Sequence, residues 1–257
     1  MLDTVYESLT HSLRLLSRGS HAARLIERKG VVAAVIAVSP ERSVLNSVTY
    51  GHADGLGDGY DEIAAAYESI GAQWTVWARH GDADAATLLA ERGHVLDAEP
   101  EAMGRSLANP PERPELDVEW TDRGSLHDLA ELNDLAYGYG DGSFAKPLPG
   151  ISLDDGVVYV ARTGGDPVGC LLMSDHGSNS DVEWVAVAPE ARGRGLSGKL
   201  LAHALADAAE RGLETSTLVS TRLGRPVYER LGYQALGSLQ MWERRRAPSS
   251  APRSPRT

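Results

Sequence analysis

The sequence contains a single cysteine, Cys170, which excludes a framework of intrachain disulfides. It has no run of roughly 18 apolar residues, the length that a membrane-spanning helix requires. Its opening segment, MLDTVYESLTHSLRLL, lacks the basic and then apolar layout of a secretion signal. The eight histidines are dispersed, without the spacing of a metal site. From these absences we expect a cytoplasmic protein with no membrane partner and no metal.

Basic residues are in deficit, and the net charge is −11. Residues 114–243 carry most of the excess, with 20 acidic and 10 basic side chains. This negative charge repels nucleic acid phosphates, so we expect no nucleic acid partner. An amine is compatible with it as a binding partner. The alternative is that the acidic side chains only keep the protein soluble. The sequence does not fix the oligomeric state, and a homodimer is left open.

Proline marks a boundary near the middle of the chain. Pro110, Pro111 and Pro114 oppose both a helix and a central strand. We therefore predict an N-terminal domain at 1–109, a linker at 110–114 and a second domain at 115–243. The remaining residues, 244–257, hold five arginines among proline and serine, which predicts a disordered basic tail.

Residues 115–243 alternate between strand and helix patterns, which indicates an α+β (mixed α/β) fold. We expect strands at 116–121, 157–162, 167–173, 182–187, 215–219 and 233–242, and helices at 126–137, 193–211 and 225–231.

A similar order of elements is expected in the first half of the chain. It predicts helices at 3–16, 60–70 and 85–92, and strands at 31–38, 44–49, 74–78 and 103–107. From residue 44 onward the order matches that of residues 182–242. The segment Leu89–His94 also echoes Tyr228–Tyr233, with a methionine at a similar distance beyond each. The repeat predicts two tandem modules.

The most informative segment is 185–198, where a buried strand leads through a glycine-rich turn into a long helix. Gly193 and Gly195 allow positive φ angles and a close approach of the backbone to a ligand. The first N–H groups of the helix have no internal partners and face outward at the positive end of the dipole. The segment therefore predicts a seat for a phosphate or pyrophosphate, with Arg192 and Arg194 adding charge.

Two nucleotide-binding families share parts of this pattern. Gly193, Gly195 and Gly198 satisfy the dinucleotide-binding spacing, but no acidic residue follows about 20 residues later at the end of a second strand. Lys199 is not part of the G-x-x-x-x-G-K-[ST] pattern of a Walker loop, so the segment does not match that family.

The segment resembles motif A of the GNAT superfamily of acyl-CoA-dependent N-acyltransferases. Arg192 and Gly195 fit its signature, and Ser197 stands where Gly or Ala is usual. Residues 224–233 resemble motif B, in which a tyrosine, here Tyr228, is followed four residues later by glycine and an aromatic residue. The resemblance covers roughly residues 115–243.

The resemblance implies a splayed mixed sheet flanked by helices, with acyl-CoA lying in the gap between two strands. It implies acetyl-CoA as the acyl donor. The residues that it implies for binding are Val185, Ala186, Val187, Arg192, Gly193, Arg194, Gly195, Leu196, Ser197, Gly198 and Thr221.

Acetyl transfer to an amine needs a base for the amine and an acid for the leaving thiolate, whose pKa is about 8.5 like that of a cysteine. Tyr228 matches the family's general acid, and a packed aromatic residue is the alternative. Glu183 is the candidate base, because strand alternation places this charge on one face with Val185 and Val187. Asp181, on the same face, is a second candidate base. A paired structural carboxylate is the alternative for Glu183.

The loop after the helix at 126–137 walls the acceptor site in similar proteins. Tyr137, Tyr139 and Asp141 are therefore candidate substrate-binding residues that could hold a cationic amine. A merely flexible loop is the alternative.

The N-terminal module lacks this chemistry. Its segment 51–59, expected as the loop before the helix at 60–70, has Asp54 and Asp58 in place of the arginines, and these would repel a pyrophosphate. Leu89 stands where Tyr228 stands in the echo. We therefore expect a degenerate second GNAT-like module that packs on or shapes the active one.

The sequence thus predicts an N-acetyltransferase that transfers the acetyl group of acetyl-CoA to a primary amine of a small molecule, by direct attack in a ternary complex. One alternative is a protein lysine or N-terminal amine as the acceptor. Another is an acyl-CoA-binding regulator or pseudoenzyme. The sequence fixes neither the acceptor nor the length of the acyl chain.

Overall fold

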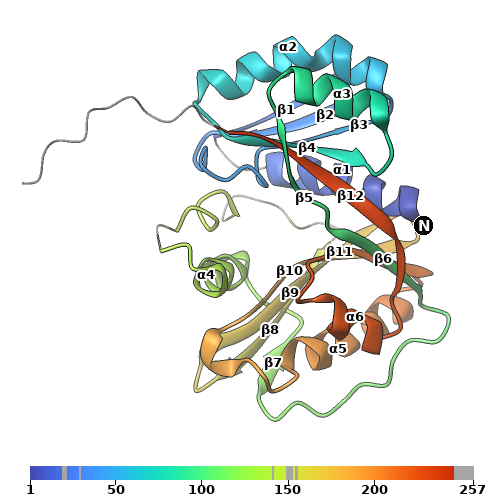
Figure 1. Ribbon diagram of the computed structural model, residues 1–257. Coiled ribbons are helices and arrows are strands. Elements are labelled where there is room, and N and C mark those ends of the chain that lie inside the picture. The colour runs from blue at the N-terminus through green and yellow to red at the C-terminus, as the bar shows by residue number, and fades with distance from the viewer. Residues whose placement is uncertain (19–21, 29, 141, 149–152, 154–155, 246–257) are drawn as a thin grey trace, which may run out of the picture.

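The computed structural model describes residues 1–18, 22–28, 30–140, 142–148, 153 and 156–245. Their strands form one mixed sheet of 12 strands (Figure 1). The first half holds α1 (Leu2–Ser17), β1 (Ala23–Arg28), β2 (Val31–Ile36), β3 (Ser47–Tyr50), α2 (Ala53–Ser69), β4 (Trp74–Arg79), α3 (Ala83–Glu91), β5 (Val95–Ala98) and β6 (Glu101–Ser106). The second half holds β7 (Glu119–Thr121), α4 (Leu126–Tyr137), β8 (Gly156–Thr163), β9 (Asp166–His176), β10 (Asn179–Val187), the 3-10 helix η2 (Pro189–Ala191), α5 (Leu196–Glu210), β11 (Thr215–Ser220), α6 (Arg225–Arg230) and β12 (Gln234–Arg244).

Local sequence signals set the bounds of α4, which confirms the predicted helix at 126–137. Ser125 and Asp128 form a capping box, in which the Ser125 hydroxyl accepts a hydrogen bond from the Asp128 N–H at 3.1 Å. At the other end, Gly138 adopts a left-handed conformation with φ of 73° and stops the helix.

The two halves exchange their last strands. β6 follows α3 in the first half but pairs with β11 of the second, where Met103 lies opposite Leu218. β12 pairs with β6 and then continues to β4, where Met241 lies opposite Trp77. The strand order is β1-β2-β3-β4-β12-β6-β11-β10-β9-β8-β7, and β5 pairs with β12. The sheet therefore runs through both halves, and the boundary at 110–114 stays a prediction.

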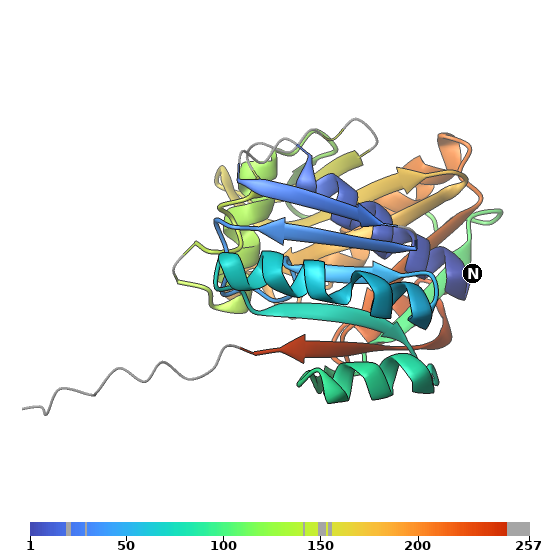
Figure 2. The ribbon, with the colours of Figure 1, turned by 90° about the horizontal axis from the view of Figure 1, so that it is seen from above.

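Helices cover both faces of this sheet (Figures 1 and 2). In the first half, Leu16 of α1 shares a core with Ala34 of β2, whereas Ile63 of α2 shares a core with Ala33 on the opposite face of that strand. α1 also contacts β9, β10 and β11, so it bridges the two halves. No described helix combines the length and the apolar character needed to cross a membrane.

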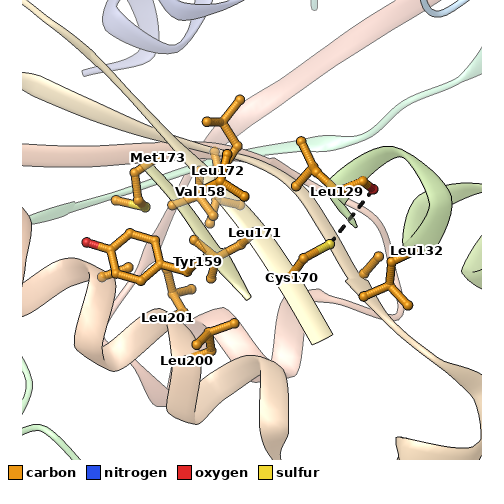
Figure 3. Close-up of a cluster of buried hydrophobic side chains, with 14 of the residues drawn as sticks. Leu129, Leu132, Val158, Tyr159, Cys170, Leu171, Leu172, Met173, Leu200 and Leu201 are labelled. Atoms are coloured by element: carbon orange, nitrogen blue, oxygen red, sulfur yellow. Dashed lines mark hydrogen bonds between the residues drawn. The ribbon is translucent and has the colours of Figure 1, made fainter. Parts of the chain in front are cut away.

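The second half repeats this layering around β8 and β9. Figure 3 shows Leu129 and Leu132 of α4 near Cys170, with Leu200 and Leu201 of α5 beside Tyr159. Cys170 is 1% exposed, and burial raises the pKa of its thiol to about 12. The side chain is therefore a packing residue rather than a nucleophile at neutral pH.

Two parts of the first half differ from the sequence prediction. β1 and β5 are strands that the pattern did not reveal. The prediction of a loop at 51–59 is wrong, because α2 begins at Ala53. Leu56 is 1% exposed, and a Cβ at Gly59 would lie in ordinary contact with Val31 of β2 at 3.8 Å, so this part of α2 packs on the sheet. Burial of this face outweighs the low helix propensity of Gly55, Gly57 and Gly59 in the first two turns of α2.

Candidate active site

A cleft opens where β10 and β11 diverge. The two parallel strands pair over three residues only, from Asn179 opposite Thr215 to Asp181 opposite Thr217. Within the described sheet, β10 then continues to Val187 beside β9 alone, so one edge of its backbone faces the gap. The cleft has a volume of about 290 Å³. Its lining residues are Tyr137, Val182, Trp184, Val185, Val187, Ser197, Val219, Thr221, Leu223, Gly224, Val227 and Tyr228.

A bulge interrupts β10 inside this cleft. The pairing with β9 shifts between Glu183 and Ala186, so Trp184 and Val185 together stand opposite a single residue. Trp184 has a φ of 57°, which no other non-glycine residue in the described part of the chain shares in sign. The buried side chain of Asn133 in α4 supports this backbone, because its Nδ2 donates to the Trp184 carbonyl at 3.1 Å. Sequence reasoning missed both residues, although an asparagine on the apolar face of a helix was a usable signal.

The bulge also changes the face on which Glu183 lies. Glu183 pairs with Leu172 and Ala186 pairs with Cys170, so these side chains share a face, and Val187 lies on the other. The prediction that Glu183 shares a face with Val187 is therefore wrong. One extra residue in a strand reverses the alternation beyond it.

Glu183 lines a separate cavity of about 10 Å³ between β10, α1 and α4. Trp184 Nε1 donates to Glu183 Oε2 at 3.2 Å, whereas Oε1 is buried without a hydrogen-bond partner among the described residues. Burial raises the pKa of the Glu183 carboxyl, and the polar neighbours Ser12 and Trp184 oppose the rise. Trp184 lines both this cavity and the cleft. Glu183 itself does not line the cleft, and its role as a base stays a prediction.

Asp181 lies at the point where the two strands separate. It is 6% exposed, and Thr217 Oγ1 donates to its carboxylate at 2.5 Å. Burial, followed by the nearby Glu183, raises the pKa of Asp181 well above its usual range. Asp181 does not line the cleft, so its role as a base also stays a prediction. Among the residues that the structure describes, no group of three His, Cys, Asp or Glu side chains could hold a metal ion.

The turn after β10 leaves the start of α5 uncapped. Gly193 and Gly195 have φ angles of 79° and 71°, which glycine adopts without strain. Gly195 is the N-cap residue and provides no side-chain bond, and the first turn of α5 carries no acidic residue. The outward N–H groups at this helix start are therefore free to receive an anion beside Ser197, which lines the cleft. Gly198 is less constrained, since a Cβ there would meet Val227 at an ordinary 3.5 Å.

The two arginines of the turn do not line the cleft. Arg192 donates to the carbonyls of Ala136 at 2.7 Å and Val187 at 3.2 Å, and so ties the end of α4 to the end of β10. Arg194 pairs with Asp117 at 2.7 Å. Both cations lie near the helix start, and their contact with a pyrophosphate stays a prediction.

Tyr228 of α6 faces the cleft from the other side. Its ring lies so close to Gly224 that a Cβ at that position would approach Tyr228 Cε2 to 2.9 Å. Burial, and to a smaller extent the nearby Tyr137, raises the pKa of Tyr228 to about 12. The hydroxyl has no hydrogen bond to any described residue and stays protonated at neutral pH, so it is available as a donor. Thr221 also lines the cleft, and its hydroxyl accepts from the Gly224 N–H at 3.2 Å.

The three candidate acceptor-binding residues do not share one environment. Tyr137 lines the cleft and is 53% exposed. Tyr139 stacks against Tyr137 with ring centroids 6.0 Å apart, but the Arg42 guanidinium lies 3.8 Å over its ring. That face of Tyr139 is therefore closed to a cationic amine. Asp141 lies outside the described residues.

The first half has a counterpart of the cleft that is filled. β3 and β4 are parallel and pair over two residues before they diverge. Tyr6 of α1 bridges the gap, because its hydroxyl donates to the Trp77 carbonyl at 2.7 Å and accepts from the Tyr50 N–H at 2.9 Å. The start of α2 borders a hollow of about 550 Å³ whose lining includes Asp54 and Asp82. This hollow is larger than the cleft, but its carboxylates oppose an anion.

Residues 154–235 match the family model described as an acetyltransferase (GNAT) domain. No curated protein matches the sequence.

Solved structures resemble nearly the whole chain. A GCN5-related N-acetyltransferase from Kribbella flavida matches with a TM-score of 0.65 and 17% identity, over 93% of this chain and 95% of that one. One from Sphaerobacter thermophilus matches with a TM-score of 0.59 and 20% identity, over 93% of each chain. A tandem GNAT protein from the clavulanic acid biosynthesis pathway matches with a TM-score of 0.57 and 14% identity, over 95% of this chain and 96% of that one. Residues 154–235 thus match a GNAT acetyltransferase domain, and nearly the whole chain shares the overall fold of a tandem GNAT protein.

Proposed function

We propose that this protein transfers the acetyl group of acetyl-CoA to a primary amine of a small molecule, by direct attack in a ternary complex. The observation that carries the proposal is that a free strand edge, an uncapped helix start and the Tyr228 hydroxyl meet at one cleft. A GNAT domain supports acyl transfer in general. What we propose beyond acyl transfer in general is the identity of the donor, the class of acceptor and the role of each residue.

The residues of the cleft fit an acyl-CoA donor, which would supply the acetyl thioester. An extended polar chain can bond to the unpaired edge of β10 near Val185 and Val187, as an added strand does. The N–H groups at the start of α5, around Ser197 and Gly198, suit a pyrophosphate. Valines from β10, β11 and α6 supply apolar walls for the chain between these two ends.

Two side chains would move protons during transfer. The amine nitrogen forms a bond to the acyl carbon while the bond from that carbon to sulfur breaks, and the nitrogen loses a proton. Tyr228 would donate its hydroxyl proton to the departing sulfur. Glu183 would accept the amine proton through water, since its carboxyl does not line the cleft.

A covered acceptor side favours a small molecule over a protein. α1 contacts β10 on the face opposite α5, and residues 39 and 42 of the first half contact Ser143 and Tyr139 beside α4. A protein lysine or N-terminal amine would need an open groove at this place.

A library of primary amines, followed by release of free thiol from acetyl-CoA, tests the proposal. We expect thiol release that depends on a subset of the amines, with the N-acetyl product identified by mass spectrometry. Ser197→Asp serves as the control that does not bind the donor. Tight binding of acetyl-CoA without transfer to any amine would contradict the proposal and favour a regulator.

A further inference from the structure

A segment of the first half holds the loop that follows α4. Ser39 Oγ donates to the Ser143 carbonyl, and Arg42 Nε donates to the Ser143 hydroxyl. The Arg42 guanidinium also lies 3.8 Å over the Tyr139 ring. Ser39 and Ser143 are both 0% exposed. These contacts join residues about 100 positions apart in sequence, so they belong to the interface between the halves.

The segment that carries Arg42 is itself fixed. Asn46 is fully buried, and its Oδ1 accepts from the Ile36 N–H at 2.7 Å. Its Nδ2 donates to the carbonyls of Ser39 at 2.9 Å and Arg42 at 3.1 Å. Arg42 therefore projects from a turn whose backbone is held by a buried amide, which lowers the entropy that its contacts must overcome.

The loop that receives Arg42 continues into the wall of the cleft. The ring of Tyr139 lies 6.0 Å from Tyr137 and 6.0 Å from Phe144, and Phe144 lies 4.6 Å from Trp184. Tyr137 and Trp184 both line the cleft. The carboxylate of Asp134 accepts from the N–H groups of Phe144 at 3.0 Å and Ala145 at 2.9 Å, which fixes the far side of the loop.

We propose that Arg42 is a positioning residue for the acceptor side of the cleft, through which the first half of the chain controls acceptor binding. This inference rests on the proposed acetyl transfer at the cleft. Arg42 acts by holding Tyr139 and Ser143, which in turn set the positions of Tyr137 and, through Phe144, of Trp184. The first half is then part of the acceptor site, although its own strand gap is filled.

Kinetics with Arg42→Met test the inference, because methionine keeps an unbranched apolar stem but removes the charge and the hydrogen-bond donors. With the fastest amine from the library, we expect the KM for the amine to rise about 10-fold, in line with the loss of a cation–π contact and a charged hydrogen bond. The affinity for acetyl-CoA should change less than about 2-fold. Arg42→Lys keeps a cation over Tyr139 and should restore part of the loss.

Arg28→Met is the matched control. Arg28 lies in the same half and pairs with Glu62 in an exposed ion pair away from the interface. We expect its kinetic constants to equal those of the unmodified protein. An unchanged KM for the amine in Arg42→Met, or an equal rise in Arg28→Met, would overturn the inference.

Hydrogen exchange followed by mass spectrometry provides a readout that needs neither an acceptor nor turnover. Arg42→Met should exchange faster in peptides that cover 134–148, with no change in β9 to β11. Faster exchange in a protein that acetylates no amine would show that Arg42 positions this loop, while the proposed function and the control of acceptor binding both fail. Unchanged exchange in a protein that is active on amines would refute the role of Arg42 and leave the proposed function intact.

Discussion

The two halves of the molecule share one frame but differ at the places where chemistry would occur. β3, α2, β4, α3 and β6 repeat the order of β10, α5, β11, α6 and β12. The echo seen in the sequence is also structural. The His94 N–H donates to the Leu89 carbonyl at 2.9 Å, and the Tyr233 N–H donates to the Tyr228 carbonyl at 3.1 Å. Each bond follows a glycine with a positive φ, Gly93 or Gly232.

Three differences separate a filled gap from an open one. Tyr6 bridges the diverging strands of the first half, whereas the gap of the second half is a cleft. α2 carries Asp54 in its first turn, whereas α5 carries no acidic residue there. Leu89 is buried and apolar, whereas Tyr228 faces the cleft. A fold thus provides positions, and the residues at those positions decide whether a site exists.

The largest expected effect comes from giving α5 the charge of α2. Asp54 is the second residue of α2 and Ser197 is the second residue of α5. In Ser197→Asp, a carboxylate beside the pyrophosphate should weaken binding of acetyl-CoA by about 100-fold or more, because like charges in contact cost several kcal/mol. Calorimetric titration measures this change. Ser197→Ala should bind nearly as the unmodified protein does, and equal losses in both variants would argue against an electrostatic cause.

Removing the hydroxyl that distinguishes Tyr228 from Leu89 should have the next largest effect. Tyr228→Phe should lower kcat by about 100-fold, because the leaving thiolate loses its proton donor. The affinity for acetyl-CoA should stay within about 3-fold. Tyr233→Phe is the control. The Tyr233 hydroxyl bonds Ser216 at 2.7 Å in the core, so this variant should lose about 1 kcal/mol of stability and keep its kcat. A normal kcat in Tyr228→Phe would remove Tyr228 from the mechanism.

Glu183 offers a test by pH. The base is active when deprotonated, and burial raises its pKa, so kcat/KM should rise with pH above the usual range of a glutamate. Glu183→Gln should lose this rise and lower kcat/KM by at least about 10-fold. A pH profile with the same rise in Glu183→Gln would point to another base.

Stability provides a second measurement on the same variant. A carboxyl with a raised pKa binds its proton more tightly in the folded state, so its stabilising contribution is present below the unfolded pKa and is lost as pH rises through the folded one. Glu183→Gln should therefore melt at a higher temperature than the unmodified protein at pH 8 and at a similar one at pH 4. Glu131→Gln, at an exposed position of α4, should show no such dependence.

The smallest effect concerns two glycines of the turn. Gly195→Ala places a side chain at φ of 71°, which should cost about 1 kcal/mol of stability and weaken acetyl-CoA binding by about 10-fold. Gly198→Ala lies within α5, where a Cβ has room, and should change neither quantity by much. Denaturant unfolding and calorimetric titration measure the two effects. Equal losses at both positions would show that the conformation at Gly195 is not the cause.

Most elements of the second half could be predicted because their signals are local. The capping box at Ser125 and the stop at Gly138 lie within α4 or next to it, and the strand–turn–helix at the start of α5 is contiguous. The same approach failed at α2, since the packing of Leu56 and Gly59 on a distant strand decides its first turns.

The sequence by itself determined the series of strands and helices, the glycine turn, the absence of acid at the start of α5 and the place of Tyr228 in the order of elements. The tertiary structure decided which gap is open, which strands the two halves exchange and on which face Glu183 lies. The physical reason is the separation along the chain between the residues that interact. Capping and periodicity act within about one turn of a helix or a few residues of a strand. The bulge at Trp184, the Tyr6 bridge and the contact of Arg42 with Tyr139 each depend on partners that only the folded chain brings together.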